Sequence, residues 1–335
     1  MSGIFTQLKT TIQVVSTCLS LVLNSFLIIM ILRKSPSKMG NYRYLMIYFS
    51  CSAMIFSLLD VITQPYAHTL DRCFVAVVKI GMFGPLGTWI LLCSVAGWFG
   101  VTITCFAIHF AYRFFALERK GRLRFFSDSY LVFWFILPLI VGFLWGALIF
   151  IYLGPNKATS DYIEASIYED YQLTIDQVTY MSALYFFKDN TPNIQHFTGV
   201  GLLLIIMFIS FFLVIQYGIR SFILIRKLLK NQGESEYSRN LQKQLYKALV
   251  VQFCFPLFLM YMPIGIYFIV PITGINIQTF SRIVGLIYAI YPAVDPLPII
   301  FIIDNYRFAV FKLFHICESR NRIQEYYASS EAVSS

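Results

Sequence analysis

The sequence predicts an all-α integral membrane protein built from seven transmembrane helices. Of its 335 residues, 58% are hydrophobic and only 13% are charged, which is too few charges to cover a soluble globule of this size. A helix of roughly 20 apolar residues crosses the bilayer core and satisfies its own backbone hydrogen bonds there. Seven such stretches occur, at about residues 11–32, 44–64, 84–112, 129–153, 197–219, 248–270 and 281–303.

Lysine and arginine in the connecting loops predict the orientation of the bundle. Cytoplasmic loops carry an excess of these two residues. The loops after the first, third and fifth stretches, together with the tail, contain twenty lysine and arginine residues. The loops on the opposite side contain six. We therefore expect the amino terminus outside and the carboxyl terminus in the cytoplasm. The net charge of +9 reflects this bias and attraction to anionic membrane lipid, and it gives no reason to expect a nucleic-acid partner.

One membrane domain is expected at residues 1–318, followed by a short, polar, disordered cytoplasmic tail at 319–335. No internal repeat appears, which argues against the doubled architecture of many transporters. The seven cysteines fall mostly within the apolar stretches and imply no disulfide framework.

A short helix lying in the membrane interface is expected after the seventh stretch. Phe308, Phe311 and Phe314 recur at a spacing that places them on one helical face. Cys317 follows them and is a candidate for palmitoylation, with an unmodified cysteine as the alternative.

Ionisable residues at bilayer depth are the candidate functional groups, because each costs free energy to insert. Asp60 lies in the outer third of the second stretch. It is interpreted as a carboxylate that contacts a ligand or locks helices together; the alternative is an acid hydrogen-bonded near the interface. His109 and Arg113 are four residues apart, hence on one face of the third stretch. They form either a switch or an interfacial anchor.

The sixth and seventh stretches contain prolines that make them bendable. Proline removes a backbone donor and clashes with the preceding turn, so Pro256 and Pro263 allow a bend in the sixth stretch. Asp295 and Pro296 stand together in the inner half of the seventh. Movement of these helices would change the inner face of the bundle, although proline in membrane helices can also be purely architectural.

No catalytic or metal-binding constellation is visible, so the sequence does not predict an enzyme, a metal site or a cofactor. It has no HExxH motif, nucleophile elbow or P-loop, and its four histidines are scattered. The seventh stretch lacks a lysine that could carry retinal.

Five segments, spread from the first stretch to the tail, carry a resemblance to a known family. They are the run from Ser35 to Phe49, Ser57-Leu58-Leu59-Asp60 with Pro65, the run from His109 to Phe114, the run from Tyr291 to Pro298, and Asn305-Tyr306-Arg307. Together they resemble the nematode serpentine chemoreceptors of the Str group, which include serpentine receptor class r-10-like proteins.

This resemblance implies a G-protein-coupled receptor of chemosensory, olfactory type in the plasma membrane, in the sensory cilium of a chemosensory neuron. Its implied partners are a small odorant or water-soluble chemical, a heterotrimeric G-protein and membrane lipid. Tyr112-Arg113 resembles the Asp/Glu-Arg-Tyr element of rhodopsin-like receptors, and Asp295-Pro296 resembles their Asn/Asp-Pro, which favours the switch interpretation of His109.

Three departures from the rhodopsin-like pattern are present. Tyr112 replaces the acid before the arginine, so no salt bridge to Arg113 can form from that position. Phe253-Cys254-Phe255-Pro256 replaces Cys-Trp-x-Pro in the sixth stretch. The loop at 154–196 contains no cysteine that could pair with Cys73.

The predicted ligand site lies among the outer halves of the second, third, sixth and seventh stretches, although aromatic residues there can equally be helix packing. Its candidate residues are Asp60, Trp89, Tyr261, Tyr267 and Tyr288. The residues predicted for switching and G-protein coupling are His109, Tyr112, Arg113, Pro256, Asp295 and Pro296.

The alternative function is a ligand-gated ion channel or transporter of the seven-helix type. The known proteins of that kind have their amino terminus inside, contrary to the orientation that the loop charges predict.

Overall fold

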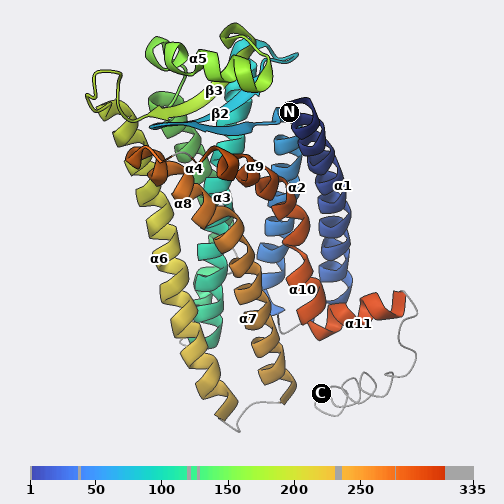
Figure 1. Ribbon diagram of the computed structural model, residues 1–335. Helices are drawn as coiled ribbons and strands as arrows, with labels where there is room; N and C mark the ends of the chain where they lie inside the picture. The colour runs from blue at the N-terminus through green and yellow to red at the C-terminus, as the bar shows by residue number, and fades with distance from the viewer. Residues whose placement is uncertain are drawn as a thin grey trace.

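The structure is a computed structural model that describes residues 2–36, 39–118, 122–126, 129–230, 236–275 and 277–313. Within this part of the chain, seven helices are long and apolar enough to cross a membrane. They run side by side as an elongated bundle (Figure 1). The all-α class and the seven predicted stretches are therefore confirmed. The spans are Thr6–Lys34, Tyr42–Thr63, Gly84–Glu118, Tyr130–Tyr152, Ile194–Lys227, Glu236–Thr273 and Gln278–Ile302.

The first five spans are single helices, and the last two are interrupted. The single helices are α1 (Ser2–Lys34), α2 (Tyr42–Thr63), α3 (Gly84–Glu118), α4 (Ser129–Tyr152) and α6 (Ile194–Lys230). The sixth span joins α7 (Glu236–Pro256), a π-helical turn (Leu257–Tyr261), α8 (Met262–Ile269) and a 3₁₀ turn (Val270–Thr273); the seventh joins α9 (Gln278–Val294) and α10 (Leu297–Ile302). The fifth and sixth spans extend beyond their predicted ends, because hydropathy detects only the apolar part of a helix.

Helix α1 has its polar side chains turned inward. Lys9, Gln13, Ser16, Ser20 and Asn24 are all buried and recur every three or four residues, so they share one helical face. Large apolar residues of the same helix are exposed, including Val22 at 65%. A helix with this pattern places its apolar face in lipid and its polar face against the bundle.

Helix α3 runs through the centre of the bundle and packs tightly against α4. A Cβ atom on Gly142 would lie 2.5 Å from Val101 Cγ2, and one on Gly97 would lie 2.6 Å from the Gly142 carbonyl oxygen. Glycine at these positions lets the two backbones approach closely, as is common between membrane helices.

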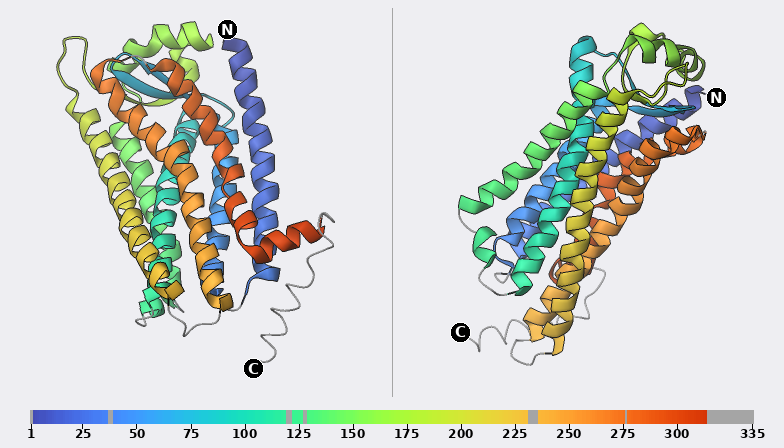
Figure 2. Two further views of the ribbon diagram at one scale, coloured as in Figure 1. Left: turned by 60° about the horizontal axis from the view of Figure 1, so that its bottom comes forward. Right: turned by 90° about the vertical axis from the view of Figure 1, so that its left-hand side faces the viewer.

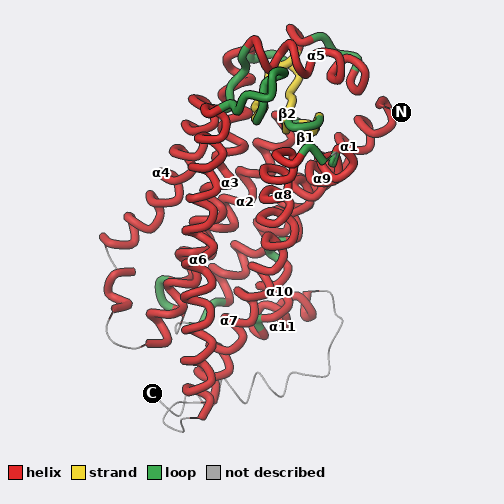
Figure 3. Tube along the Cα trace, turned by 60° about the vertical axis from the view of Figure 1, so that its left-hand side comes forward, coloured by secondary structure: helices red, strands yellow, loops and turns green. Residues whose placement is uncertain are grey.

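A small cap covers the end of the bundle at which α1 begins, and this end is called the capped end below (Figures 1 and 2). It contains a three-stranded antiparallel sheet in the order β1-β2-β3 and a helix, α5. The bounds are β1 (Tyr66–Leu70), β2 (Cys73–Lys79), a 3₁₀ turn (Ile175–Gln177), β3 (Val178–Leu184) and α5 (Lys157–Tyr171). In Figure 3 the strands lie between α5 and the membrane-length helices. Neither the sheet nor α5 is predicted from the sequence.

The two faces of this sheet pack against different partners. Cys73, Val75 and Val77 form an apolar cluster with Ile163 and Ile167 of α5. The alternate residues of β2 turn toward the bundle. Strand β2 is consequently buried over nearly its whole length, so it lacks the alternation of apolar and polar residues that identifies a half-exposed strand.

The segments that form the cap are held together by hydrogen bonds between strands rather than by disulfides. Cys73 is a free thiol, and β2 pairs with β3 along seven residue pairs, from Cys73 with Leu184 to Lys79 with Val178. This sheet ties the segment before α3 to the segment before α6 without the cysteine pair that the 154–196 loop lacks.

Helix α11 (Asp304–Leu313) follows the seventh span at the opposite end and turns sharply away from the bundle (Figure 1). The predicted short helix is therefore present, and it contains Phe308 and Phe311. Phe314, Cys317 and the tail predicted at 319–335 lie outside the described residues.

Candidate functional site

A cavity lies directly beneath the sheet, and the volume open to water-sized molecules is about 100 Å³. Its walls come from α2, α3, α4, α8 and α9. Its roof is a row of residues paired across the three strands, Ala67, Ala76 and Met181. The cavity therefore lies between the cap and five spans, the second, third, fourth, sixth and seventh.

Three of the five predicted ligand residues line this cavity, namely Asp60, Tyr267 and Tyr288. The other two, Trp89 and Tyr261, are not among its lining residues. Trp89 packs against Phe150 of α4, with ring centroids 5.9 Å apart. The hydroxyl of Tyr261 lies 3.2 Å from Ser210 Oγ on α6, because the π-helical turn directs this residue toward the fifth span.

Asp60 forms the polar end of the cavity together with residues of α1. Its Oδ2 accepts a hydrogen bond of 2.9 Å from Gln13 Nε2. Lys9 is close enough to attract the carboxylate electrostatically. Its ammonium donates to the Pro65 carbonyl oxygen and lies 3.8 Å from the centre of the Tyr66 ring. Asp60 thus both locks α1 to α2 and borders the cavity.

Lys9 and Gln13 are absent from the candidates named from the sequence. Lys9 precedes the predicted start of the first span and is one of the six basic residues that the loop charges assign to the outer side. In the structure it is buried within α1. The signal that identifies both is the four-residue spacing from Lys9 to Gln13 and on to Thr17, which marks an inward polar face.

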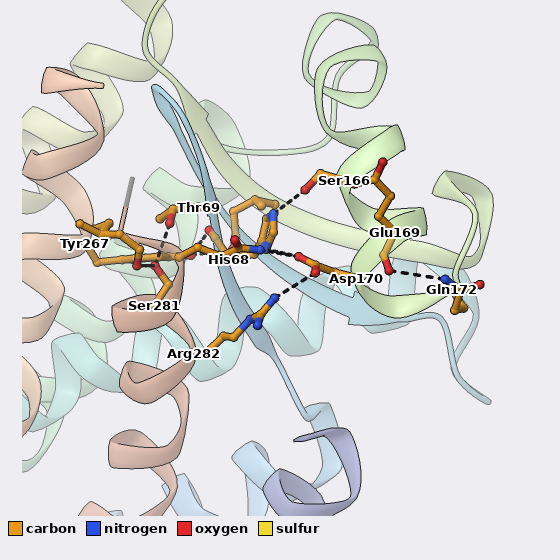
Figure 4. Close-up of polar contacts among 12 residues, drawn as sticks. His68, Thr69, Ser166, Glu169, Asp170, Gln172, Tyr267, Ser281 and Arg282 are labelled. Atoms are coloured by element: carbon orange, nitrogen blue, oxygen red, sulfur yellow. Dashed lines mark hydrogen bonds and ion pairs between the residues drawn. The ribbon is translucent and has the colours of Figure 1, made fainter. Parts of the chain in front are cut away.

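Asp170 of α5 joins the cap to the seventh span (Figure 4). Its Oδ1 accepts a hydrogen bond of 2.9 Å from Arg282 Nη2, and its Oδ2 accepts one of 2.6 Å from Gln278 Nε2. Both donors belong to α9. His68 of β1 lies beside the same carboxylate, with Nδ1 3.3 Å from Asp170 Oδ2, and its Nε2 is 2.9 Å from Ser166 Oγ. One carboxylate thus connects α5, β1 and α9.

Burial governs the protonation of His68. Its side chain is fully buried, and loss of hydration lowers the pKa of its imidazole below the usual 6.5. Asp170 opposes this shift, and Arg282 adds to it by repulsion. The neutral form of His68 is therefore favoured in the folded cap.

Helix α8 is attached to the underside of the cap. Tyr267 donates its hydroxyl proton toward two strand carbonyl oxygens, Val75 O at 2.6 Å and His68 O at 3.2 Å. Phe74 of β2 stacks on Phe268 with ring centroids 5.0 Å apart, and the Tyr185 hydroxyl donates to the Phe268 carbonyl oxygen. A displacement of the cap would therefore be transmitted to α8.

A second polar centre lies at the opposite end of the bundle, around Arg113. The Arg113 guanidinium stacks 3.6 Å from the centre of the Tyr42 ring, and its Nη1 donates to Gln242 Oε1 across 3.2 Å. His109 Nδ1 is 3.3 Å from the Tyr42 hydroxyl, and the Tyr112 ring packs 5.1 Å from that of Tyr42. The structure therefore brings His109, Tyr112 and Arg113 together around Tyr42.

Two further glutamines of α7 bind the seventh span and the helix after it. Gln252 Nε2 donates to Asp295 Oδ2 across 3.0 Å, and the Tyr291 hydroxyl lies 3.2 Å from Asp295 Oδ1. Gln244 Nε2 donates to Asp304 Oδ2 at 2.5 Å, and its Oε1 accepts from the Asp304 amide at 3.0 Å. Three neutral side chains of one helix thus hold α3, the seventh span and α11. None of these glutamines was a sequence candidate.

The two predicted switch prolines stand at helix interruptions. Pro256 ends α7, immediately before the π-helical turn, and Pro296 stands in the break between α9 and α10. The carbonyl of Pro292, in the turn before that break, accepts from Asn24 Nδ2 across 3.0 Å. Freed backbone groups near a break are commonly re-satisfied by a neighbouring helix in this way.

Comparison with known proteins identifies the family. The sequence matches the family described as "Serpentine type 7TM GPCR chemoreceptor Str" over residues 9–311. This chain belongs to the Str family of serpentine chemoreceptors. It is 33% identical over 316 residues to G-protein coupled receptor str-217 of Caenorhabditis elegans, a match that covers 92% of this chain and 90% of the relative.

Two further relatives of this Str-family chain are proteins named Serpentine receptor class r-10. The protein from Caenorhabditis briggsae is 26% identical over 323 residues, covering 94% of this chain and 91% of the relative. The protein from Caenorhabditis elegans is 24% identical over 346 residues, covering 99% of this chain and 98% of the relative. The recognition made from sequence segments is therefore confirmed, and the Str chain is a multi-pass seven-helix chemoreceptor.

Proposed function

We propose that this chain binds a small chemical from outside the cell and signals to a heterotrimeric G-protein inside. The observation that carries the proposal is that the cavity and the Arg113 centre are joined by the same two interrupted spans. Helices α8 and α9 line the cavity. Beyond their interruptions, α7 and α10 continue toward the opposite end, where α7 contacts Arg113. The spans can therefore carry a change from one end to the other.

In this proposal the capped end faces the outside and the Arg113 end faces the cytoplasm. The excess of lysine and arginine in the loops at the Arg113 end supports this orientation. The receptor would then reside in the plasma membrane, in the sensory cilium of a chemosensory neuron. Its partners would be an odorant or water-soluble chemical, a G-protein and membrane lipid.

The proposed mechanism begins with a preference of the ligand for one of two receptor states, since a ligand shifts an equilibrium only through such a preference. Contacts in the cavity displace α8, and the π-helical turn at Leu257–Tyr261 allows α7 to move relative to it. Movement of α7 breaks the contacts of Gln242, Gln244 and Gln252. Arg113 is released, and a groove opens for the G-protein.

The test uses cells that express the full chain with an amino-terminal tag. Labelling of the tag on intact cells is expected, since the proposal places this end outside. Pooled volatile and water-soluble chemicals are then screened for a calcium response through a promiscuous G-protein. For a chemical that activates the wild type, Arg113→Ala should abolish the response at equal surface level. An unchanged response would refute this role for Arg113, and labelling only after permeabilisation would refute the orientation.

A further inference from the structure

The size of the cavity restricts what it can hold. About 100 Å³ is open to water-sized molecules, whereas an engineered apolar protein cavity of roughly 150 Å³ holds one benzene molecule. Apart from Asp60, the hydroxyl groups of two tyrosines and the indole N–H of Trp145, the lining is almost entirely hydrocarbon. The occupant is therefore a compact molecule, no larger than a six-membered ring, with a largely apolar body.

The charges beside the cavity are already matched. Asp60 accepts a hydrogen bond from Gln13 and has the ammonium of Lys9 nearby. Because Lys9 already matches the charge of Asp60, the carboxylate offers a cationic ligand little net attraction, and it would repel an anionic ligand. Because a charge also loses its hydration on entering an apolar cavity, an uncharged ligand is strongly favoured.

A buried hydroxyl group at the cavity, that of Tyr288, has no hydrogen-bond partner among the described residues. Of the two lining tyrosines, Tyr267 uses its hydroxyl on the sheet carbonyls of Val75 and His68. The ring of Tyr288 packs edge-to-face on Phe56 with centroids 6.1 Å apart, which restrains it. A buried donor without a partner costs free energy that a bound acceptor would recover.

From these three features we propose that the cavity binds one uncharged molecule no larger than a six-membered ring, whose hydrogen-bond acceptor receives the Tyr288 hydroxyl proton. This ligand class rests on the proposed function for the identity of the cavity as the receptor's ligand site. It specifies size, charge and one polar contact, each of which can be tested with a simple probe.

The experiment uses three probes of equal ring size on the purified full chain in phospholipid nanodiscs. Cyclohexane has no acceptor, oxane has one ether oxygen, and piperidine carries a positive charge at pH 7. Each is supplied at defined aqueous concentrations through the vapour phase, and half-saturation is read from the shift in thermal unfolding. Wild type is compared with Tyr288→Phe and with Tyr48→Phe. The latter is a matched control, because the Tyr48 hydroxyl donates to Phe135 O on α4, away from the cavity.

Tyr288→Phe should weaken oxane binding by about 3- to 10-fold, as expected for one hydrogen bond, and leave cyclohexane binding unchanged. Tyr48→Phe should change neither. Piperidine should not bind to any of the three proteins. Equal effects of Tyr288→Phe on oxane and cyclohexane would overturn the acceptor role. Piperidine binding that is lost in Asp60→Asn would overturn the exclusion of charge.

A second variant tests the size limit without touching Tyr288. Ala96→Leu adds bulk at a residue that lines the cavity, so it should abolish the binding of both uncharged rings. Cyclododecane should not bind to wild type. If it stabilises wild type as cyclohexane does, or if neither small ring binds wild type, the proposed ligand class is wrong.

The binding assay contains no G-protein, so the two proposals can fail separately. If the rings bind as described while expressing cells respond to no chemical, the signalling proposal fails. If cells respond to other chemicals while the rings do not bind, only the ligand class fails.

Discussion

Arg113 of α3 donates a hydrogen bond of 3.2 Å to the side-chain oxygen of Gln242 on α7. The arginine is therefore held by a neutral amide, and the residue before it is Tyr112 instead of an acid. Its remaining guanidinium nitrogens, Nε and Nη2, have no hydrogen-bond partner among the described residues. Stacking on Tyr42 offsets part of this cost.

Loss of the Gln242 contact should raise basal signalling. A hydrogen bond to a charged group contributes about 1.5–3 kcal/mol, which corresponds to a shift of roughly 10- to 100-fold in a two-state equilibrium. Gln242→Ala is expected to increase ligand-independent G-protein activation in expressing cells, measured at equal surface level. Lys243→Ala is the control, because Lys243 is exposed on the same helix. Equal basal activity in the two variants would contradict the restraining role of Gln242.

Removal of the Lys9 ammonium should destabilise the receptor. Lys9→Met leaves the buried Asp60 carboxylate without its nearby cation, and a buried polar group that loses a partner costs about 1–3 kcal/mol. The unfolding temperature of the purified chain should therefore fall. The double variant Lys9→Met, Asp60→Asn should recover much of the loss, because the buried charge is gone and Gln13 keeps an acceptor. If the double variant unfolds at the temperature of Lys9→Met, the electrostatic explanation is incorrect.

Close packing of α3 and α4 can be tested with a pair of glycine substitutions. In Gly142→Ala the new Cβ would lie 2.5 Å from Val101 Cγ2 and 3.0 Å from the Gly97 carbonyl oxygen. The helices must separate, at a cost of about 1–3 kcal/mol, so thermal stability and surface expression should fall. Gly201→Ala on α6 is the control, since nothing lies within 4 Å of its Cβ. A stability loss of the same size in Gly201→Ala would show that close contact is not the cause.

Acidification should destabilise the cap through His68. Burial lowers the pKa of His68 in the folded cap below its usual 6.5, so below about pH 6.5 the unfolded chain takes up a proton that the folded cap does not. Stability then decreases as the pH falls from about 6.5 toward the lowered pKa, and it increases as the pH rises.

Thermal unfolding at about pH 7.5 and 5.5 measures this effect. Wild type should lose more stability on acidification than His68→Gln, because the variant lacks the titrating ring while the other acids and bases of the chain are shared. If both proteins show the same dependence on pH, His68 does not control the stability of the cap.

The sequence alone predicts the seven-helix bundle, because lipid imposes a simple rule on the backbone. Every backbone group in the hydrocarbon must be satisfied within its own helix, so a run of about 20 apolar residues predicts a span almost regardless of its neighbours. Short segments distributed over the chain were also specific enough to identify the Str family. In the Arg113 centre, the grouping of His109 with Arg113 followed from helical spacing alone.

The sequence determined the seven spans, the family and the residues that could function, since these depend on local composition and spacing. Only the tertiary structure decided the cap and the cavity. Strand β2 is buried on both faces, so its sequence has no period of two, and its pairing with β3 joins residues about 100 positions apart. Tyr288 lines the cavity while Tyr261 faces Ser210, a difference set by the π-helical turn and by packing between helices, which no local pattern encodes.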